Sequence, residues 1–406
     1  MAGALSHLRV LDLSRVLAGP WAGQILADLG AEVIKIERPG TGDDTRHWGP
    51  PYLKDRDGHD TTEAAYFLAA NRGKKSVTVD ITCHRGQAIV RSLAAKSDIL
   101  LENYKVGGLA KYGLDYDSLK PVNPGLIYCS ITGFGQTGPY RHRAGYDFII
   151  QGMGGLMSIT GERDDRPGGG PQKVGVAVAD LMTGMYATVA VLAALAYRER
   201  SGVGQYIDLA LLDTQVAAVA NMNMNYLISG IPPKRYGNAH ANIVPYQVFP
   251  CRDGYLVLAV GNDTQFTRFC EVAGRPELAR DLRFATNSQR VRNREILVPL
   301  LEEVLRRRDG RDWMEALEAV GVPCGLINNL QQVFEDPQVR DRGMKIDLPH
   351  PLSGTIPLVA SPIRLSETPV RYENPPPTLG QHTGEVLGVL GLDQETLERL
   401  AAEGVI

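Results

Sequence analysis

The chain has 406 residues, more than a single hydrophobic core usually takes, so its length predicts two domains or one domain with a large excursion. A formal net charge of −3 provides no global basic field, which argues against nucleic acid or a membrane surface as the main partner. The five cysteines show no CxxC spacing, and the eight histidines are scattered, so neither a disulfide framework nor a metal site is predicted. With no apolar or Arg-rich leader before the first strand pattern, we expect a cytoplasmic protein of bacterial type, or an organellar one already trimmed.

Strands and helices alternate in the first part of the chain. This alternation predicts an α/β fold with a parallel, doubly wound, Rossmann-like sheet. Two long apolar helices follow, over 181–197 and 209–228. The loop 41–51, rich in Gly, Pro and Asp, is predicted to be irregular and, because it follows a strand directly, to hold functional residues. The expected strands are 8–13, 32–37, 76–80, 98–102 and 126–131, and the first helices begin at Pro20 and His84.

The pattern of predicted strands and helices changes near residue 226, where a smaller α+β domain is expected. Its predicted strands are 244–249 and 255–260, and its predicted helices are 264–272, 290–308 and 311–319. The tail is punctuated by prolines, so we expect it to wrap the first domain or a partner subunit rather than fold alone. The predicted organisation is a large domain over 1–225, a small domain over 226–328, and a C-terminal segment, 329–406, that returns to the large domain.

Asp180 stands at the start of the apolar run 181–197, where no other residue is charged. An acidic residue in this position usually marks a helix N-terminus, so by itself the pattern predicts a cap. A catalytic carboxylate is the alternative. A membrane span is not favoured, because the run is at the short end of the roughly 17 to 25 residues that a span needs.

Gly133, Gly135 and Gly138 match the G-x-G-x-x-G pattern of dinucleotide-binding loops. The residues that follow, PYRHR, do not begin a helix, and the first strand-to-helix turn lacks the pattern. A nicotinamide cofactor is therefore not predicted.

Six ordered blocks extend through the first half of the chain: RVLDLSRVLAGPWAGQILADLGAEVIKIERPG, NRGKKSVTVD, ENYKVGGLAKYGLDY, SITGFGQTGP, AGYDFIIQGMGGLMSITG and KVGVAVADLMTGMYA. Together they resemble the family III CoA-transferases, which include formyl-CoA, carnitine and bile-acid CoA-transferases and the related 2-methylacyl-CoA racemases. The resemblance implies a homodimer of two chains threaded as interlocked rings. It also implies a CoA thioester as substrate, with no permanently bound cofactor and no metal.

The same resemblance assigns roles to individual residues. Asp180 is the expected nucleophile, which forms a mixed anhydride and then an aspartyl-CoA thioester, and the apolar residues around it are expected to exclude water. Tyr146 and Asp147 should lie beside the reacting group. Without the resemblance, we would interpret Arg38 and Lys111 as solvated surface charges and Tyr104 as a side chain packed in the core. The implied CoA contacts are Val16, Leu17, Ala18, Arg38, Val79, Thr82, Asn103, Tyr104, Lys105 and Lys111, and the implied substrate contacts from the small domain are Gly237, Asn238 and His240.

Two departures from the family narrow the reaction. Oxalate-using members carry glutamine where this chain has Leu17, which argues against formyl or oxalyl transfer. Racemases carry histidine where this chain has Tyr146, and tyrosine, with an ordinary pKa near 10, is a poor proton shuttle at neutral pH. The segments GNAHANIVPYQVF, AVGNDTQF and PPPTLGQHT look closest to the branch of the family that uses succinyl-CoA and dicarboxylic acids such as glutarate or 3-hydroxy-3-methylglutarate. A racemase and a non-catalytic acyl-CoA binding protein are the alternatives.

Overall fold

A computed structural model describes residues 3–406, which divide into two compact units. The larger unit comprises Met1–Leu156, Val174–Met224 and Gln338–Ile406, and the smaller comprises Met157–Lys173 and Asn225–Pro337. The predicted boundaries differ from these limits in two respects. Residues 157–173 belong to the smaller unit, and the C-terminal return begins at Gln338 rather than at residue 329.

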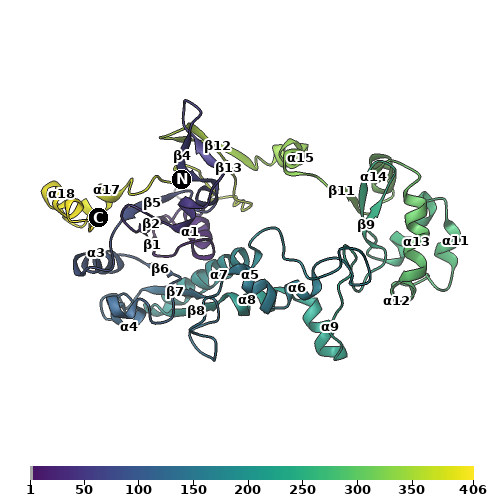
Figure 1. Cartoon of the computed structure of the whole chain (residues 1–406), viewed down its shortest axis with the longest axis horizontal. Helices are drawn as coiled ribbons and strands as arrows, with labels where there is room; N and C mark the ends of the chain where they lie inside the picture. The colour runs from purple at the N-terminus through teal and green to yellow at the C-terminus, as the bar shows by residue number, and fades with distance from the viewer. Residues whose placement is uncertain (1–2) are drawn as a thin grey trace. The chain divides into compact units, whose positions relative to one another are not determined.

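A six-stranded sheet forms the centre of the larger unit, in the order β5-β2-β1-β6-β7-β8 (Figure 1). Every neighbouring pair is parallel, which confirms the predicted parallel α/β sheet. Chain order reverses at β1, whose neighbours are β2 and β6, so this sheet has the switch point at which doubly wound folds bind ligands. The strands are β1 (Arg9–Asp12), β2 (Glu32–Glu37), β5 (Lys74–Thr78), β6 (Ile99–Glu102), β7 (Ile127–Thr132) and β8 (Tyr206–Ala210).

The central strands are apolar on both faces because helices cover both sides of the sheet. Leu11, Ile34 and Leu100 pack in one core with α3 and the C-terminal helices. The residues that alternate with them, such as Val10 and Val33, pack in a second core with α1 and α7. The covering helices are α1 (Ala18–Asp28), α3 (His84–Ala94), α5 (Asp147–Met153), α7 (Val178–Ser201), α8 (Leu211–Ala218), α17 (Thr383–Gly388) and α18 (Gln394–Ala402).

Helices α1 and α7 pack closely at their N-terminal ends. A Cβ atom built on Gly184 would lie 2.7 Å from the Ala18 carbonyl oxygen and 3.0 Å from Cβ of Trp21. Only glycine therefore fits at this crossing. The contact brings the first turn of α7, with Asp180, next to the loop that leads from β1 into α1.

The predicted helix over 209–228 is wrong. Its first residues belong to strand β8, which pairs with β7, and the rest forms α8 and α9 (Asn221–Ser229). Between these helices Ala220 has a φ of 48°, which interrupts helical geometry. The predicted helix 290–308 is likewise two helices, α12 (Asn287–Arg292) and α13 (Arg294–Leu305). Local propensity favoured one long helix in each case, whereas strand pairing and packing decided otherwise.

Short elements complete the larger unit. The loop after β2 was predicted to be irregular, but it contains a short 3₁₀ helix that Asp43 caps through the Thr45 N–H group, at 3.0 Å. Among residues 3–406, α7 is the one helix whose length and apolar composition would allow it to cross a membrane, and half of its most apolar window is buried. The short elements of this unit are β3 (Tyr52–Lys54), β4 (Asp60–Ala64), β12 (Lys345–His350), β13 (Gly354–Val359), the 3₁₀ helices Asp44–His47 and Ala110–Tyr112, and α2 (Ala65–Leu68), α4 (Tyr116–Leu119) and α16 (Pro337–Asp341). Helix α6 (Leu156–Ile159) lies almost wholly in the smaller unit.

The C-terminal tail returns to the edge strand of the six-stranded sheet. The His382 N–H group donates to the Ser76 carbonyl at 2.9 Å, and the Asp80 N–H group donates to the Val405 carbonyl at 2.8 Å. Side chains of α17 and α18 also join the core beneath β5 and β2. The tail thus completes the larger unit.

The smaller unit has its own core, built on the antiparallel sheet β11-β10-β9. Phe249, Phe266 and Trp313 are almost completely buried in it. The predicted strand pair and the predicted helix 264–272 are confirmed. The elements are β9 (Tyr246–Pro250), β10 (Tyr255–Ala259), β11 (Cys324–Leu326), α10 (Asp263–Val272), α11 (Pro276–Arg280), α12, α13, α14 (Gly310–Glu318) and α15 (Leu330–Glu335).

Candidate active site

The loops that follow β1 and β6 are joined at the switch point of the sheet. The Asn103 side chain accepts a hydrogen bond from the Arg15 N–H group at 2.9 Å and donates to the Arg15 carbonyl at 2.6 Å. Both backbone groups of Arg15 are thereby held by one amide. Asn103 therefore sets the spacing of the two loops that line the crevice.

A cleft of about 410 Å³ lies at this point and contains Asp180; we call it the Asp180 cleft. It brings together most of the residues assigned by resemblance to the reacting end of the thioester and to pantetheine. Asp147 is not in its wall. The predicted residues that line it are Val16, Leu17, Ala18, Asn103, Tyr104, Lys105, Lys111, Tyr146 and Asp180.

A second cleft, of about 500 Å³, contains Arg38 and is called the Arg38 cleft. Val79 and Thr82, assigned by resemblance to the adenine region, also line it. The two clefts share Tyr104 and Arg15 in their walls, so they adjoin. A long ligand with an anionic end can therefore lie across both.

Asp180 is the third residue of α7 and does not cap it, which corrects the expectation from the sequence. The N-cap residue is Ala177, and the capping carboxylate comes from α5. Oδ1 of Asp147 accepts hydrogen bonds from the N–H groups of Ala179 at 2.7 Å and of Asp180 at 3.3 Å. Because Asp147 satisfies these donors, the carboxylate of Asp180 is left for chemistry.

The environment of Asp180 favours its neutral form. Its side chain is only 8% exposed, and none of the hydrogen bonds within residues 3–406 reaches its carboxylate oxygens. Burial, and then the nearby charge of Asp147, raise the pKa of Asp180 to about 7. At neutral pH a large fraction is ionised but poorly solvated, which suits a carboxylate nucleophile.

Asp147 is itself held in place by Gln151, which is completely buried. Nε2 of Gln151 donates to Oδ2 of Asp147 at 2.6 Å, and Oε1 of Gln151 accepts from the Val174 N–H group at 2.9 Å. One buried amide thus ties α5 to the segment that leads into α7. The structure places Asp147 next to Asp180, and its contacts are with the backbone of α7.

Three aromatic or basic groups near the site were missed from the sequence. Burial, and then the charge of Asp180, raise the pKa of Tyr66, so this phenol lies close enough to Asp180 to interact with its charge. Arg141 and Arg143 line the Asp180 cleft. The only available signal was the basic cluster PYRHR, which we used to exclude a dinucleotide loop rather than to predict a site.

The predicted substrate contacts Gly237, Asn238 and His240 lie in the smaller unit. Gly237 has a φ of 59°, and Asn238 lines a separate cleft of about 180 Å³. The ring of His240 lies 5.3 Å from that of Tyr246. Their expected approach to Asp180 in a dimer stays a prediction.

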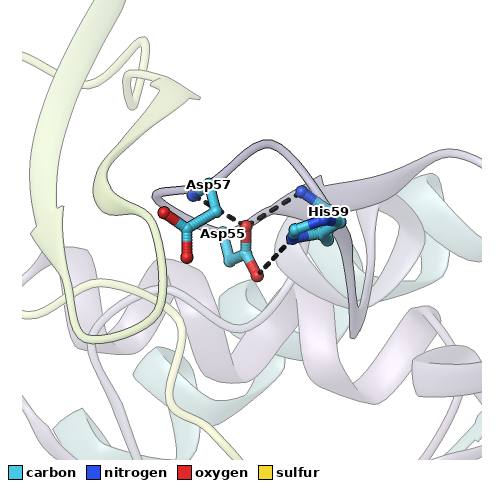
Figure 2. A group of neighbouring side chains, drawn as sticks. All are labelled: Asp55, Asp57 and His59. Atoms are coloured by element: carbon cyan, nitrogen blue, oxygen red, sulfur yellow. Dashed lines mark hydrogen bonds and ion pairs between the residues drawn. The ribbon is translucent and has the colours of Figure 1, made fainter.

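One group of potential metal ligands occurs within residues 3–406, formed by Asp55, Asp57 and His59 in the β3–β4 turn (Figure 2). Oδ1 of Asp55 accepts hydrogen bonds from the N–H groups of Asp57 and His59, each at 2.9 Å. These bonds close the turn, as aspartate commonly does at such positions. Turn geometry accounts for the group, and we assign no metal to it.

Comparison with known proteins agrees with this geometry. The profile described as CoA-transferase family III matches residues 5–383. The chain belongs to this family. The transferase is 54% identical to a succinate–glutarate CoA-transferase of Agrobacterium fabrum, over 98% of this chain and 97% of that protein. It is 44% identical to the human succinyl-CoA:glutarate CoA-transferase, over 99% of this chain and 90% of that protein.

A solved structure supports the fold of the transferase. A CAIB/BAIF family protein from Brucella suis aligns with a TM-score of 0.84 at 51% identity, covering 96% of this chain and 100% of that one. The resemblance found in the sequence is therefore confirmed, and with it the enzyme class. Neither alternative, racemase or non-catalytic binding protein, is favoured by the names of these relatives.

The charge of Asp147 should set the acidic limb of the pH profile. Replacing it with asparagine (Asp147→Asn) keeps an acceptor for the α7 N–H groups but removes the charge that helps to raise the pKa of Asp180. In the wild type, kcat/KM should rise through a pKa of about 7 as Asp180 ionises. In the variant this limb should move to lower pH, as measured by initial rates from pH 5 to 9.

Asp208→Asn is the matched control, because Asp208 is an exposed carboxylate that accepts the Gln136 N–H group instead. Its pH profile should equal that of the wild type. An unchanged acidic limb in Asp147→Asn would contradict the assigned role of this charge.

Proposed function

We propose that the protein transfers CoA from succinyl-CoA to glutarate through covalent intermediates on Asp180. The observation that carries the proposal is a buried carboxylate that faces a ligand-sized cleft and accepts no hydrogen bond within residues 3–406. The names of the relatives supply the two substrates. A lone carboxylate suffices because an anhydride is its natural product with a thioester.

The reaction has two symmetrical halves. The Asp180 carboxylate attacks the succinyl thioester carbonyl, and the C–S bond breaks to give a mixed anhydride and CoA thiolate. The thiolate then attacks the aspartyl carbonyl, which releases succinate and leaves an aspartyl-CoA thioester. Glutarate attacks this thioester to form a second anhydride, and the returning thiolate attacks the glutaryl carbonyl, which yields glutaryl-CoA and restores Asp180.

CoA lies across the two adjoining clefts in this proposal. The Arg38 cleft takes the nucleotide, where the forked guanidinium suits phosphate oxygens, and Val79 and Thr82 flank the adenine. Asn103, Tyr104 and Lys105 line the passage to the Asp180 cleft, where the thioester lies beside Val16, Leu17 and Ala18.

Arg141 and Arg143 supply the charge that a dicarboxylate requires. Neither guanidinium pairs with a carboxylate among residues 3–406; Nε of Arg141 donates to His142, and Arg143 lies 4.3 Å from the centre of the Tyr140 ring. Both are in the wall of the Asp180 cleft. We assign them to the second carboxylate of the succinyl and glutaryl groups, because an arginine fork binds carboxylate in two places.

A second copy of the chain covers the outer face of α7 in this proposal. Met185, Tyr186 and Val189 are more than two-fifths exposed, although the helix is apolar enough to be buried along its length. A contiguous apolar face of this kind marks a protein interface. The interlocked homodimer of the family would bury it. Helices α5 and α8, which pack against α7, also expose apolar side chains, namely Phe148, Ile149, Met153 and Val216.

Asp180→Asn should abolish CoA exchange between succinyl-CoA and glutarate, since an amide cannot form the anhydride. The wild type incubated with succinyl-CoA and hydroxylamine should be inactivated and carry a hydroxamate on Asp180, as detected by peptide mass spectrometry. The variant should remain unmodified. Full activity of Asp180→Asn would refute the mechanism, and α-proton exchange into deuterated water without any acceptor would indicate an isomerase.

Arg143→Gln should raise the KM for glutarate by roughly 10- to 100-fold, since one charge-assisted pair contributes about 1.5–3 kcal/mol. Butyrate has no second carboxylate, so its rate should be lower than that of glutarate in the wild type and should change little in the variant. Arg141→Gln tests the second guanidinium in the same assay. If both variants lose glutarate and butyrate activity equally, these side chains do not read the second carboxylate.

Val189→Glu should dissociate the dimer, because it places a charge in the proposed interface. Light scattering should give the mass of two chains for the wild type and a lower mass for the variant, with unchanged helical circular dichroism. Val122→Glu is the control, since Val122 is similarly exposed but precedes β7. A wild type that stays monomeric at assay concentration would exclude the interlocked dimer.

A further inference from the structure

Val16 has a left-handed backbone conformation, with a φ of 72°. This region is strongly disfavoured for a β-branched residue, and such strain persists only where the surroundings impose it. Val16 lies in the wall of the Asp180 cleft, directly before Leu17 and Ala18. The loop that faces the nucleophile is therefore held in a conformation it would not adopt alone.

The Asp43 carboxylate is the group that holds it. Both oxygens of Asp43 accept from the Val16 N–H group, each at 3.3 Å. The Lys35 ammonium lies 2.8 Å from the same carboxylate, and both side chains have no solvent exposure. The lysine also donates to the Ser14 carbonyl at 2.8 Å, two residues before Val16. One buried ion pair thus fixes the loop at two points.

This ion pair rests on a second one. The Lys74 ammonium lies 2.9 Å from Asp12 at the end of β1, again with both side chains fully buried, and Asp12 accepts the Ser14 N–H group at 3.0 Å. Such desolvated charges must be paired, so their positions are tightly defined. A rigid base beneath the loop is formed by Asp12 at the end of β1, Lys35 inside β2 and Lys74 at the start of β5.

The loop leads into a helix N-terminus that faces the same cleft. Leu17 is the N-cap residue of α1, and its side chain has no oxygen with which to cap the helix. Leu17 and Ala18 line the cleft together with Asp180, a buried residue. Free N–H groups at a helix start stabilise negative charge, which develops on the thioester carbonyl during attack.

We propose that Asp43 is a positioning residue of the transfer reaction: with Lys35, it holds Val16 in the left-handed conformation, and this keeps the start of α1 aimed at the carbonyl that Asp180 attacks. The inference rests on the proposed role of Asp180. Asp43 also lines the Arg38 cleft, but its side chain has no solvent exposure, and it acts through the backbone of Val16. Its loss should therefore lower the rate of acylation more than the binding of CoA.

A double-mutant cycle with Val16→Gly tests this, because glycine adopts a φ of 72° without strain. Asp43→Asn should lower kcat roughly 100-fold, as expected when a catalytic group is displaced by about 1 Å, with CoA affinity changed less than about threefold. In the Val16→Gly background the same substitution should lower kcat by less than about tenfold. The readouts are kcat, the rate of Asp180 hydroxamate formation, and calorimetric CoA binding.

Glu63→Gln is the matched control, since Glu63 pairs with Arg46 at 2.7 Å in the same buried region but does not contact Val16. It should lower the melting temperature without the loss of kcat. If Asp43→Asn does not fold, Thr45→Val replaces it, because the Thr45 hydroxyl donates to Asp43 at 2.8 Å and its loss leaves the ion pair intact. The same pattern is then expected at smaller size.

Equal loss of kcat in both Val16 backgrounds, or loss of CoA binding in parallel with kcat, would overturn the proposal. Failure of the proposed function gives a different result. If Asp180→Asn keeps its activity, the nucleophile is wrong whatever the Asp43 cycle shows. If Asp180→Asn is inactive and the cycle shows no coupling, only the positioning role is wrong.

Discussion

The hydrogen bonds between the Asp147 carboxylate and the first turn of α7 are the interaction on which the site depends. They satisfy N–H donors at the start of α7, so both carboxylate oxygens of Asp180 stay available to the proposed chemistry. They also bring a negative charge close to Asp180, which adds to burial in raising its pKa to about 7. Asp147 thus leaves the Asp180 carboxylate without a capping role and adds to burial in raising its pKa.

The opposite wall of the Asp180 cleft depends on two buried, positively charged lysines. Lys35 lies inside β2 and Lys74 at the start of β5. Each neutralises an aspartate, and together they hold the loop that begins at Ser14. Burial lowers the pKa of Lys74 to about 8; the charge of Asp12 opposes this change and that of Lys35 adds to it. The ion pair with Asp12 therefore persists at neutral pH. These ion pairs hold the loop on one side of the cleft, and Asp147 holds the start of α7, with Asp180, on the other.

Much of the site was accessible from the sequence, because its residues fall in contiguous blocks that resemble a known family. Nine of the predicted residues line one cleft, and Arg38, Val79 and Thr82 line its neighbour. The prediction of one long helix over 209–228 was wrong, because strand β8 pairs with β7 at the edge of the sheet. The residues of β8 carry no local pattern that indicates this pairing. Arg141 and Tyr66 were missed for the same reason: their importance comes from proximity to Asp180, which only the fold creates.

The sequence by itself determined the α/β class, the parallel sheet and the identity of the buried carboxylate, since strand alternation and motif blocks are properties of neighbouring residues. The tertiary structure decided that Asp180 is not a cap, because the group that caps α7 lies 33 residues earlier in the chain. It also decided that Val16 is strained, because the carboxylate that imposes this conformation lies 27 residues later. Both effects arise from buried polar groups that must find partners across the fold, and no local pattern specifies which partners those are.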